Sequence, residues 1–230
     1  MFSRGTIRWS MVVILACASA LAEETWTPLF DGKTLDGWTQ RGGTAPYRVE
    51  GDTIVGTTVP GKEVLDKMVS GTGNSFLCTD KNYGDFILEL EFKVDPQMNS
   101  GVQIRSNSIP EYKNGQVHGY QVEIDPSDRA WTAGIYDEGR RGWLYNLEGP
   151  EREAARKAFK QNEWNHVRVE ARGDSIKTWL NGVPAADLKD SMTPTGFIAL
   201  QVHASKDPEP REVRWRNIRI QSLDQAAPAP

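Results

Sequence analysis

The stretch Tyr120-Gln121-Val122-Glu123-Ile124-Asp125 alternates apolar and polar residues at every step. A period of two is that of a β-strand with two unlike faces, here with apolar side chains on one face and an amide and two carboxylates on the other. A second segment, Gly101–Arg105, repeats the pattern and places Gln103 and Arg105 on its polar face. If the two strands share a sheet, one face of that sheet carries amides, carboxylates and a guanidinium.

Strand patterns and turns fill most of the remaining chain. The longest strand is expected over Asp85–Val94, with apolar side chains on one face and Glu and Lys on the other, and Asn181-Gly182 is a hairpin turn signal. The one helix candidate is Pro150–Lys160. Roughly a dozen short strands predict an all-β fold, an antiparallel two-sheet sandwich with one short helix. We expect a single domain over residues 25–223 and a disordered tail over residues 224–230.

The first residues have the layout of a secretory signal peptide. Two arginines precede the apolar run Trp9–Ala20, and Ala20-Leu21-Ala22 supplies small residues for cleavage. The sequence therefore predicts a signal peptide over residues 1–22 and an exported protein, periplasmic or extracellular, because this apolar run is too short for a transmembrane span. Ile14–Cys17 loosely resembles a lipoprotein box, so a lipid anchor at Cys17 stays open.

Charge and cysteine content narrow the function classes. Lys and Arg total 27 against 31 Asp and Glu, a formal net charge of −4. No polybasic block occurs outside the leader, so a nucleic-acid partner is not expected. Cys78 is the single cysteine that follows the leader, which leaves no internal disulfide, and its strand-like surroundings predict a buried structural thiol.

His203 is the histidine best placed for chemistry. It ends a predicted strand, Gly196–His203, on the same face as Gln201. With Glu123 and Asp125 it could hold a divalent metal ion across strands, or form an ordinary hydrogen-bonded network. None of the usual zinc or calcium spacings occurs in the sequence.

Glu123-Ile124-Asp125 also resembles the start of the Glu-x-Asp-x-(x)-Glu strand of laminarinase-type retaining glycosidases. Those enzymes need a nucleophile and an acid/base carboxyl group about 5–5.5 Å apart. Here Ser127 and Asp128 stand where the last glutamate would be, and Pro126 interrupts the strand. The sequence therefore disfavours that mechanism.

Taken in order, six segments resemble the 3-keto-disaccharide hydrolase domain family. They are Leu29–Trp38, Asn99–Arg105, Gly119–Asp125, Glu163–Asn165, Trp179–Val183 and Trp215–Ile220. The resemblance extends over about residues 25–223. It implies a concanavalin A-like jelly-roll sandwich, usually exported, that acts on glycosides already oxidised to a ketone at C3.

The implied chemistry follows from the ketone, which acidifies the C2 proton. A base removes that proton, the resulting enolate expels the C1 substituent, and water adds to the enone. For this chemistry we assign His203 or Glu123 as the base. Asp125 would orient His203 or bind a metal, and Arg105 would stabilise the enolate or bind sugar hydroxyls. Further residues would bind or border the sugar: Gln103, Gln121, Gln201, Tyr136, Arg140, Arg141 and Trp143. Arg140 and Arg141 could equally lie in a solvated loop.

The main alternative is a non-catalytic carbohydrate-binding module, because lectins share this sandwich and a fold does not fix a function. A surface-interaction domain is a third possibility. His203 beside two carboxylates favours an enzyme, since sugar binding alone does not need titratable groups. On this interpretation His203→Ala abolishes turnover and leaves the fold intact.

Overall fold

The computed structural model describes residues 25–64 and 67–223. The predicted leader with Cys17 and the predicted tail at 224–230 lie outside these residues. Within the described part, no helix is both long and apolar enough to cross a membrane.

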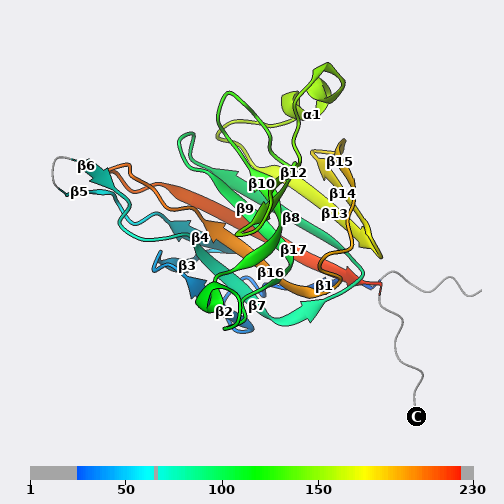
Figure 1. Cartoon of the computed structure of the whole chain (residues 1–230), viewed down its shortest axis with the longest axis horizontal. Helices are drawn as coiled ribbons and strands as arrows, with labels where there is room; N and C mark the ends of the chain where they lie inside the picture. Colours follow the sequence, from blue (N-terminus) through cyan, green and yellow to red (C-terminus); the bar gives the residue numbers. More distant parts are fainter. Residues whose placement is uncertain (1–24, 65–66, 224–230) are drawn as a thin grey trace, which may run out of the picture.

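Two antiparallel sheets form a sandwich, as the strand patterns predicted (Figure 1). The larger sheet has eight strands. Its order is β15 (Val183–Lys189), β14 (Ser175–Leu180), β13 (Asn165–Arg172), β8 (Phe86–Val94), β17 (Glu212–Ser222), β4 (Thr53–Thr57) and β3 (Tyr47–Glu50), with β1 (Thr27–Pro28) paired to β17.

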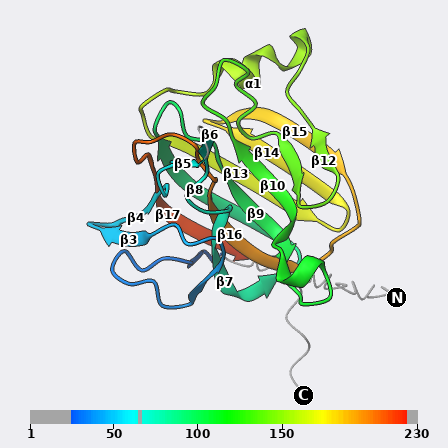
Figure 2. The same cartoon turned by 60° about the vertical axis from the view of Figure 1, so that its left-hand side comes forward.

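The smaller sheet has seven strands. Its order is β12 (Gly142–Tyr145), β11 (Ile135–Glu138), β10 (His118–Ile124), β9 (Ser100–Asn107), β16 (Gly196–Val202), β7 (Ser75–Tyr83) and β2 (Trp38–Gly42). A separate hairpin joins β5 (Lys62–Val64) to β6 (Lys67–Val69). Figure 2 shows β9, β10 and β16 in front of β8, β13 and β17.

The helical content is smaller than the sequence predicted. The candidate Pro150–Lys160 divides into a 3-10 turn, η2 (Pro150–Arg152), and a short helix, α1 (Glu153–Lys157). The helix ends where Ala158 N–H bonds the carbonyl three residues back, at Ala155, which tightens the last turn. A second 3-10 turn, η1 (Lys113–Gly115), precedes β10.

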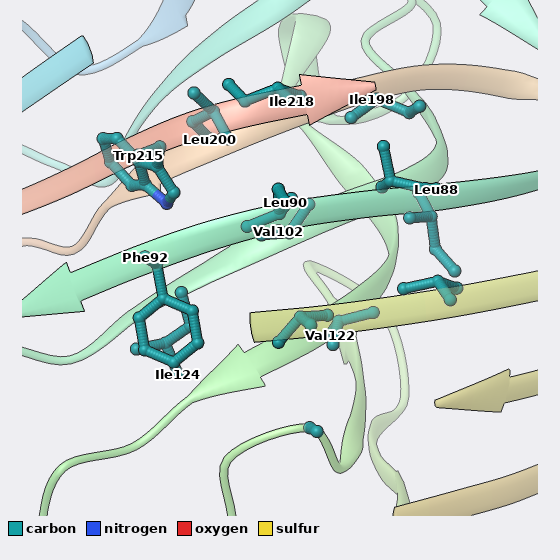
Figure 3. Packing of buried hydrophobic residues seen from close by; sticks show 14 of the residues in the cluster. Leu88, Leu90, Phe92, Val102, Val122, Ile124, Ile198, Leu200, Trp215 and Ile218 are labelled. Atoms are coloured by element: carbon teal, nitrogen blue, oxygen red, sulfur yellow. The ribbon is translucent and has the colours of Figure 1, made fainter. Parts of the chain in front are cut away.

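The core lies between the sheets because the strands alternate. Leu88, Leu90 and Phe92 of β8 face the smaller sheet, where Val122 and Ile124 of β10 meet them (Figure 3). Burying each such side chain contributes about 1.5–3 kcal/mol. The apolar half of the 120–125 stretch is therefore fixed inward, which sends Gln121 and Glu123 to the outer face of the smaller sheet.

That outer face is itself well covered, since every residue of β10 is buried. Part of the cover is a small apolar cluster of Phe76, Cys78, Val117, Phe197 and Ala199. Cys78 is a free, fully buried thiol, as predicted, and burial raises its pKa to about 12. The polar groups of this face therefore lie in partly desolvated surroundings.

Candidate active site on the outer face of the smaller sheet

A cavity of about 370 Å³ opens on the outer face of the smaller sheet. Its walls come from β10, β11 and β12 and from residues that flank β7, β9 and β16. The lining residues are Asn74, Asn99, Gln121, Glu123, Arg129, Tyr136, Glu138, Trp143 and His203. Of the sequence-predicted site residues, the structure thus brings Glu123, Gln121, Tyr136, Trp143 and His203 together.

Glu123 is the most deeply buried acid of this cavity, with 4% of its surface exposed. Asn99 Nδ2 donates to its Oε1 at 2.6 Å, and Gln121 Nε2 donates to its Oε2 at 2.7 Å. Burial raises the pKa of Glu123 to about 7, and the two amide donors only partly oppose that rise. Near neutral pH the group can therefore both accept and donate a proton.

A chain of amides supports Glu123 from beneath. Gln103 Nε2 donates to Gln121 Oε1 at 2.6 Å, and Ser106 Oγ donates to Gln103 Oε1 at 2.8 Å. Gly101 leaves space for the Gln121 side chain, because a Cβ at Gly101 would lie 2.6 Å from it. This chain of hydrogen bonds fixes the orientation of the Gln121 amide, whose nitrogen faces Glu123.

Asp125 does not take part in the cavity, although alternation predicted that it would share the face of Glu123. Its carboxylate turns back on the following loop, where Ser127 Oγ donates at 2.6 Å and Arg129 Nε at 2.8 Å. Burial alone would raise the pKa of Asp125, but these donors outweigh it and the pKa is lowered. Asp125 is thus a stable carboxylate that anchors Arg129.

Arg129 is held on three sides. Besides its ion pair with Asp125, its guanidinium lies 4.5 Å from the ring centroid of Trp131 and 5.1 Å from that of Trp143. Trp143 also meets Tyr136 edge-on, with ring centroids 5.3 Å apart. The result is a rigid wall that offers a cation and two aromatic rings to a ligand.

Glu138 and His203 form the opposite part of the cavity. Asn74 Nδ2 lies 3.3 Å from Glu138 Oε1, while Asn74 Oδ1 accepts from the Ala204 N–H at 2.9 Å. Burial raises the pKa of Glu138, and the Asn74 donor and the nearby His203 partly oppose that rise. His203 Nδ1 lies 2.7 Å from the Ala204 carbonyl. Because a carbonyl only accepts, Nδ1 carries the proton and Nε2 of the neutral ring is the acceptor.

Arg105 lies away from the cavity, contrary to the expectation from alternation. Its backbone φ of 45° breaks the strand pattern, and its side chain reaches the turns that follow β7 and β13. There its guanidinium binds the carbonyls of Gly84 and Gly173 at 2.7 Å each and the carboxylate of Asp85 at 2.8 Å. Arg105 is 1% exposed, and its role is to hold these two turns against the smaller sheet.

Two of the predicted sugar-binding amides lie beneath the cavity wall. Gln103 is fully buried and uses its amide in the chain to Glu123. Gln201 is fully buried as well, and neither amide atom has a hydrogen-bond partner among the described residues. Of the three glutamines, Gln121 alone lines the cavity.

Arg140 and Arg141 also belong elsewhere, in neither the cavity nor a freely solvated loop. Arg140 pairs with the buried Asp137 at 2.7 Å and donates to Thr193. Arg141 bonds Asp137 at 2.5 Å and Asp190 at 2.8 Å. The alternation of β11 explains this, because Asp137 points away from the cavity that Tyr136 and Glu138 face.

The residues at the site do not fit the metal-ligand set that the sequence suggested. In the described ranges, no group of three His, Cys, Asp or Glu side chains is arranged to hold an ion. Asp125 in particular is already engaged by Ser127 and Arg129. We therefore assign no step to a metal.

Sequence reasoning missed several cavity residues. They are Asn74, Asn99, Arg129 and Glu138. One signal was available: Tyr136 and Glu138 alternate with Ile135 and Asp137, as on a strand with one functional face. The two asparagines each stand just before a strand, where no local pattern reveals their partner across the sheet.

A larger cavity, about 490 Å³, lies on the outer face of the larger sheet. Its half-buried acid, Glu89, is bound by Arg168 and Arg219. These paired charges leave no proton to exchange near neutral pH, so chemistry rather than volume favours the smaller cavity.

This sandwich is the concanavalin- and galectin-like fold that several carbohydrate-related structures share. A candidate glycosyl hydrolase from Parabacteroides distasonis is 21% identical with a TM-score of 0.58, covering 86% of this chain and 94% of its own. The carbohydrate-binding module CBM66 from Bacillus subtilis is 20% identical with a TM-score of 0.55, and the match covers 81% of this chain and 96% of the module. A lichenase from a mouse hindgut metagenome is 9% identical with a TM-score of 0.54, and the match covers 86% of this chain and 99% of the lichenase. At these identities the likeness shows the fold alone.

The family is shown by the sequence. Residues 25–221 match the model of the 3-keto-alpha-glucoside-1,2-lyase-like domain, and the chain belongs to this family. This confirms the family resemblance on which the expected chemistry rests. A search of curated proteins found no match. Family and fold together indicate a carbohydrate-active enzyme or a carbohydrate-binding module.

Proposed function

We propose that this protein cleaves glycosides whose sugar carries a ketone at C3, by removing the C2 proton and expelling the C1 substituent. The observation that carries the proposal is Glu123, a buried carboxyl group in the cavity wall with a pKa of about 7. A general base is most effective when its pKa lies near the working pH, and such a group is worth about 10²–10⁴-fold in rate. Membership of the lyase-like family supports this substrate class.

The remaining cavity groups fit the same reaction. Proton removal from C2 places negative charge on the C3 oxygen, which needs a fixed donor. Arg129, clamped by Asp125 and two tryptophan rings, can supply it, in the role that the sequence suggested for Arg105. Trp143 and Tyr136 offer apolar surface to the sugar ring.

His203 remains the second candidate base, since Nε2 of its neutral ring can accept a proton. Glu123 is preferred because it lies deeper and is held by two amide donors, which fixes its direction. After elimination, water can add to the C1=C2 bond and yield the free 3-keto sugar, so the net reaction is hydrolysis. We place this reaction in the periplasm or outside the cell, on the strength of the leader sequence.

A non-catalytic sugar-binding module is the alternative, favoured by the aromatic pair Tyr136 and Trp143 in the cavity wall. The two functions differ in whether an oxidised sugar is consumed. The test incubates the protein with 3-keto-trehalose and with trehalose, with and without a chelator, and follows sugar release by chromatography. We expect cleavage of the oxidised sugar alone. Binding of both sugars without cleavage would favour the module, and neither binding nor cleavage would contradict both functions.

A further inference from the structure

The cavity contains a second carboxyl group to which the reaction so far gives no role. Glu138 is the last residue of β11, and its side chain faces the cavity on the same side as Tyr136. The register places Tyr136 opposite Gln121 and Glu138 opposite Gly119 on β10. Glu123 lies four residues from Gly119 along β10, which is about 13 Å at roughly 3.3 Å per residue. The two carboxyl groups therefore enter the cavity from separate positions, with Tyr136 between them.

Glu138 is held in place by an amide donor. Asn74 donates to one carboxyl oxygen and is itself fixed by the Ala204 N–H. Within residues 25–64 and 67–223, no lysine or arginine forms an ion pair with Glu138. The neighbouring titratable groups are His203, Asp137 and Tyr136. Burial raises the pKa of Glu138, which favours the protonated form of a carboxyl group that lines the cavity.

Elimination needs such a group at a distance from the base. When the C1 substituent of a 3-keto glucoside is axial, the C2 hydrogen is axial on the opposite face of the ring. One side chain cannot reach both, so the base and the acid must stand at separate points around the sugar. Glu123 and Glu138 are the two carboxyl groups that line the cavity.

We propose that Glu138 is the general acid that protonates the departing C1 oxygen while Glu123 accepts the C2 proton, an inference that rests on the proposed function. The electrons of the C2–H bond first form the enolate, with its negative charge on the C3 oxygen. The C3 ketone then re-forms, and these electrons become the C1=C2 bond as the C1–O bond breaks. The leaving oxygen takes the Glu138 proton and departs as an alcohol. Glu123 ends protonated and Glu138 ionised, and exchange with water restores both.

The test compares two substrates whose leaving groups differ in how much they depend on protonation. Glu138→Gln is compared with wild type on 3-keto-trehalose, whose leaving group is a sugar alkoxide, and on 4-nitrophenyl 3-keto-α-glucoside, whose leaving phenolate is stable without one. We expect kcat/KM to fall about 10²–10³-fold on the disaccharide and less than tenfold on the nitrophenyl substrate. Turnover of the nitrophenyl substrate also shows that the variant is folded. The exposed carboxylate variant Glu163→Gln is the matched control and should match wild type on both.

An equal loss on both substrates, or no loss on either, would overturn the acid role of Glu138 and leave the proposed function standing. If wild-type protein cleaves neither substrate, the proposed function fails and this role fails with it.

Discussion

The outer faces of the two sheets each carry a shielded glutamate, and the two behave in opposite ways. Glu89 on β8 receives Arg168 at 2.7 Å and Arg219 at 2.6 Å. Burial alone would raise its pKa, but these arginines outweigh burial and the pKa is lowered. Glu123 on β10 receives only amides, and its pKa rises to about 7. Countercharge, rather than burial, therefore decides whether the pKa of a shielded glutamate falls or rises.

The same contrast extends beyond this pair of residues. On the larger sheet, Glu91 bonds Arg216 at 2.6 Å and Glu170 bonds Arg172 at 2.6 Å, so charge is balanced locally. On the smaller sheet, the guanidinium of Arg129, which lines the cavity, is already engaged by Asp125 at 2.8 Å. The cavity thus keeps Glu123 able to change protonation near neutral pH.

The largest expected effect comes from removing the base. Glu123→Gln keeps the size of the side chain but cannot accept the C2 proton, so kcat on a 3-keto glycoside should fall about 10²–10⁴-fold. Glu89→Gln is the matched variant on the other sheet, where activity should be retained while stability falls. Steady-state kinetics with circular dichroism on both variants checks this.

His203→Ala decides between the two candidate bases. If Glu123 is the base, His203→Ala should lose less activity than Glu123→Gln, because Glu123 retains its own amide donors. A larger loss in His203→Ala would move the base to the histidine. Full activity of Glu123→Gln would remove the main support for the proposed function.

The sequence predicted the strands and the polar face well, because the period of two is a local property of the extended backbone. It could not predict Arg105, since a φ of 45° interrupts alternation without a glycine to signal it. It also placed Asp125 on the reactive face. There the chain turns after Pro126 and brings Ser127 and Arg129 to the carboxylate.

Glu138 was missed for a different reason. Its segment reads as a charged loop, and its closeness to Asn74 depends on strands far apart in the sequence. Arg140 and Arg141 lie close in sequence to the cavity residues Tyr136 and Glu138. They pair instead with Asp137, which points to the other side of β11. Long-range pairing and the partners of charged groups were therefore the parts that one sequence did not reveal.

The raised pKa of Glu123 should also appear in the stability of the protein. Glu123 binds its proton more tightly when folded than at its usual pKa of 4.5, so its contribution is full below about pH 4.5 and is lost as pH rises to about 7. Each pH unit over that interval is worth about 1.4 kcal/mol, about 3 kcal/mol in total. Between pH 4.5 and 7, the free energy of unfolding of Glu123→Gln should therefore gain about 3 kcal/mol relative to wild type. Urea titrations at several pH values measure this difference, and parallel pH profiles for the two proteins would contradict the raised pKa.

The smallest expected effect tests the aromatic wall, again by comparing the two faces. Trp143 and Trp179 are both half-buried, with a guanidinium 5.1 Å and 5.9 Å from the ring centroid. Only Trp143 lines the proposed active site, so Trp143→Ala should raise KM roughly tenfold, about 1.4 kcal/mol, with a smaller change in kcat. Trp179→Ala should leave KM unchanged. If Trp143→Ala lowers kcat as strongly as it raises KM, the ring acts by holding Arg129 against the enolate and not by stacking on the sugar.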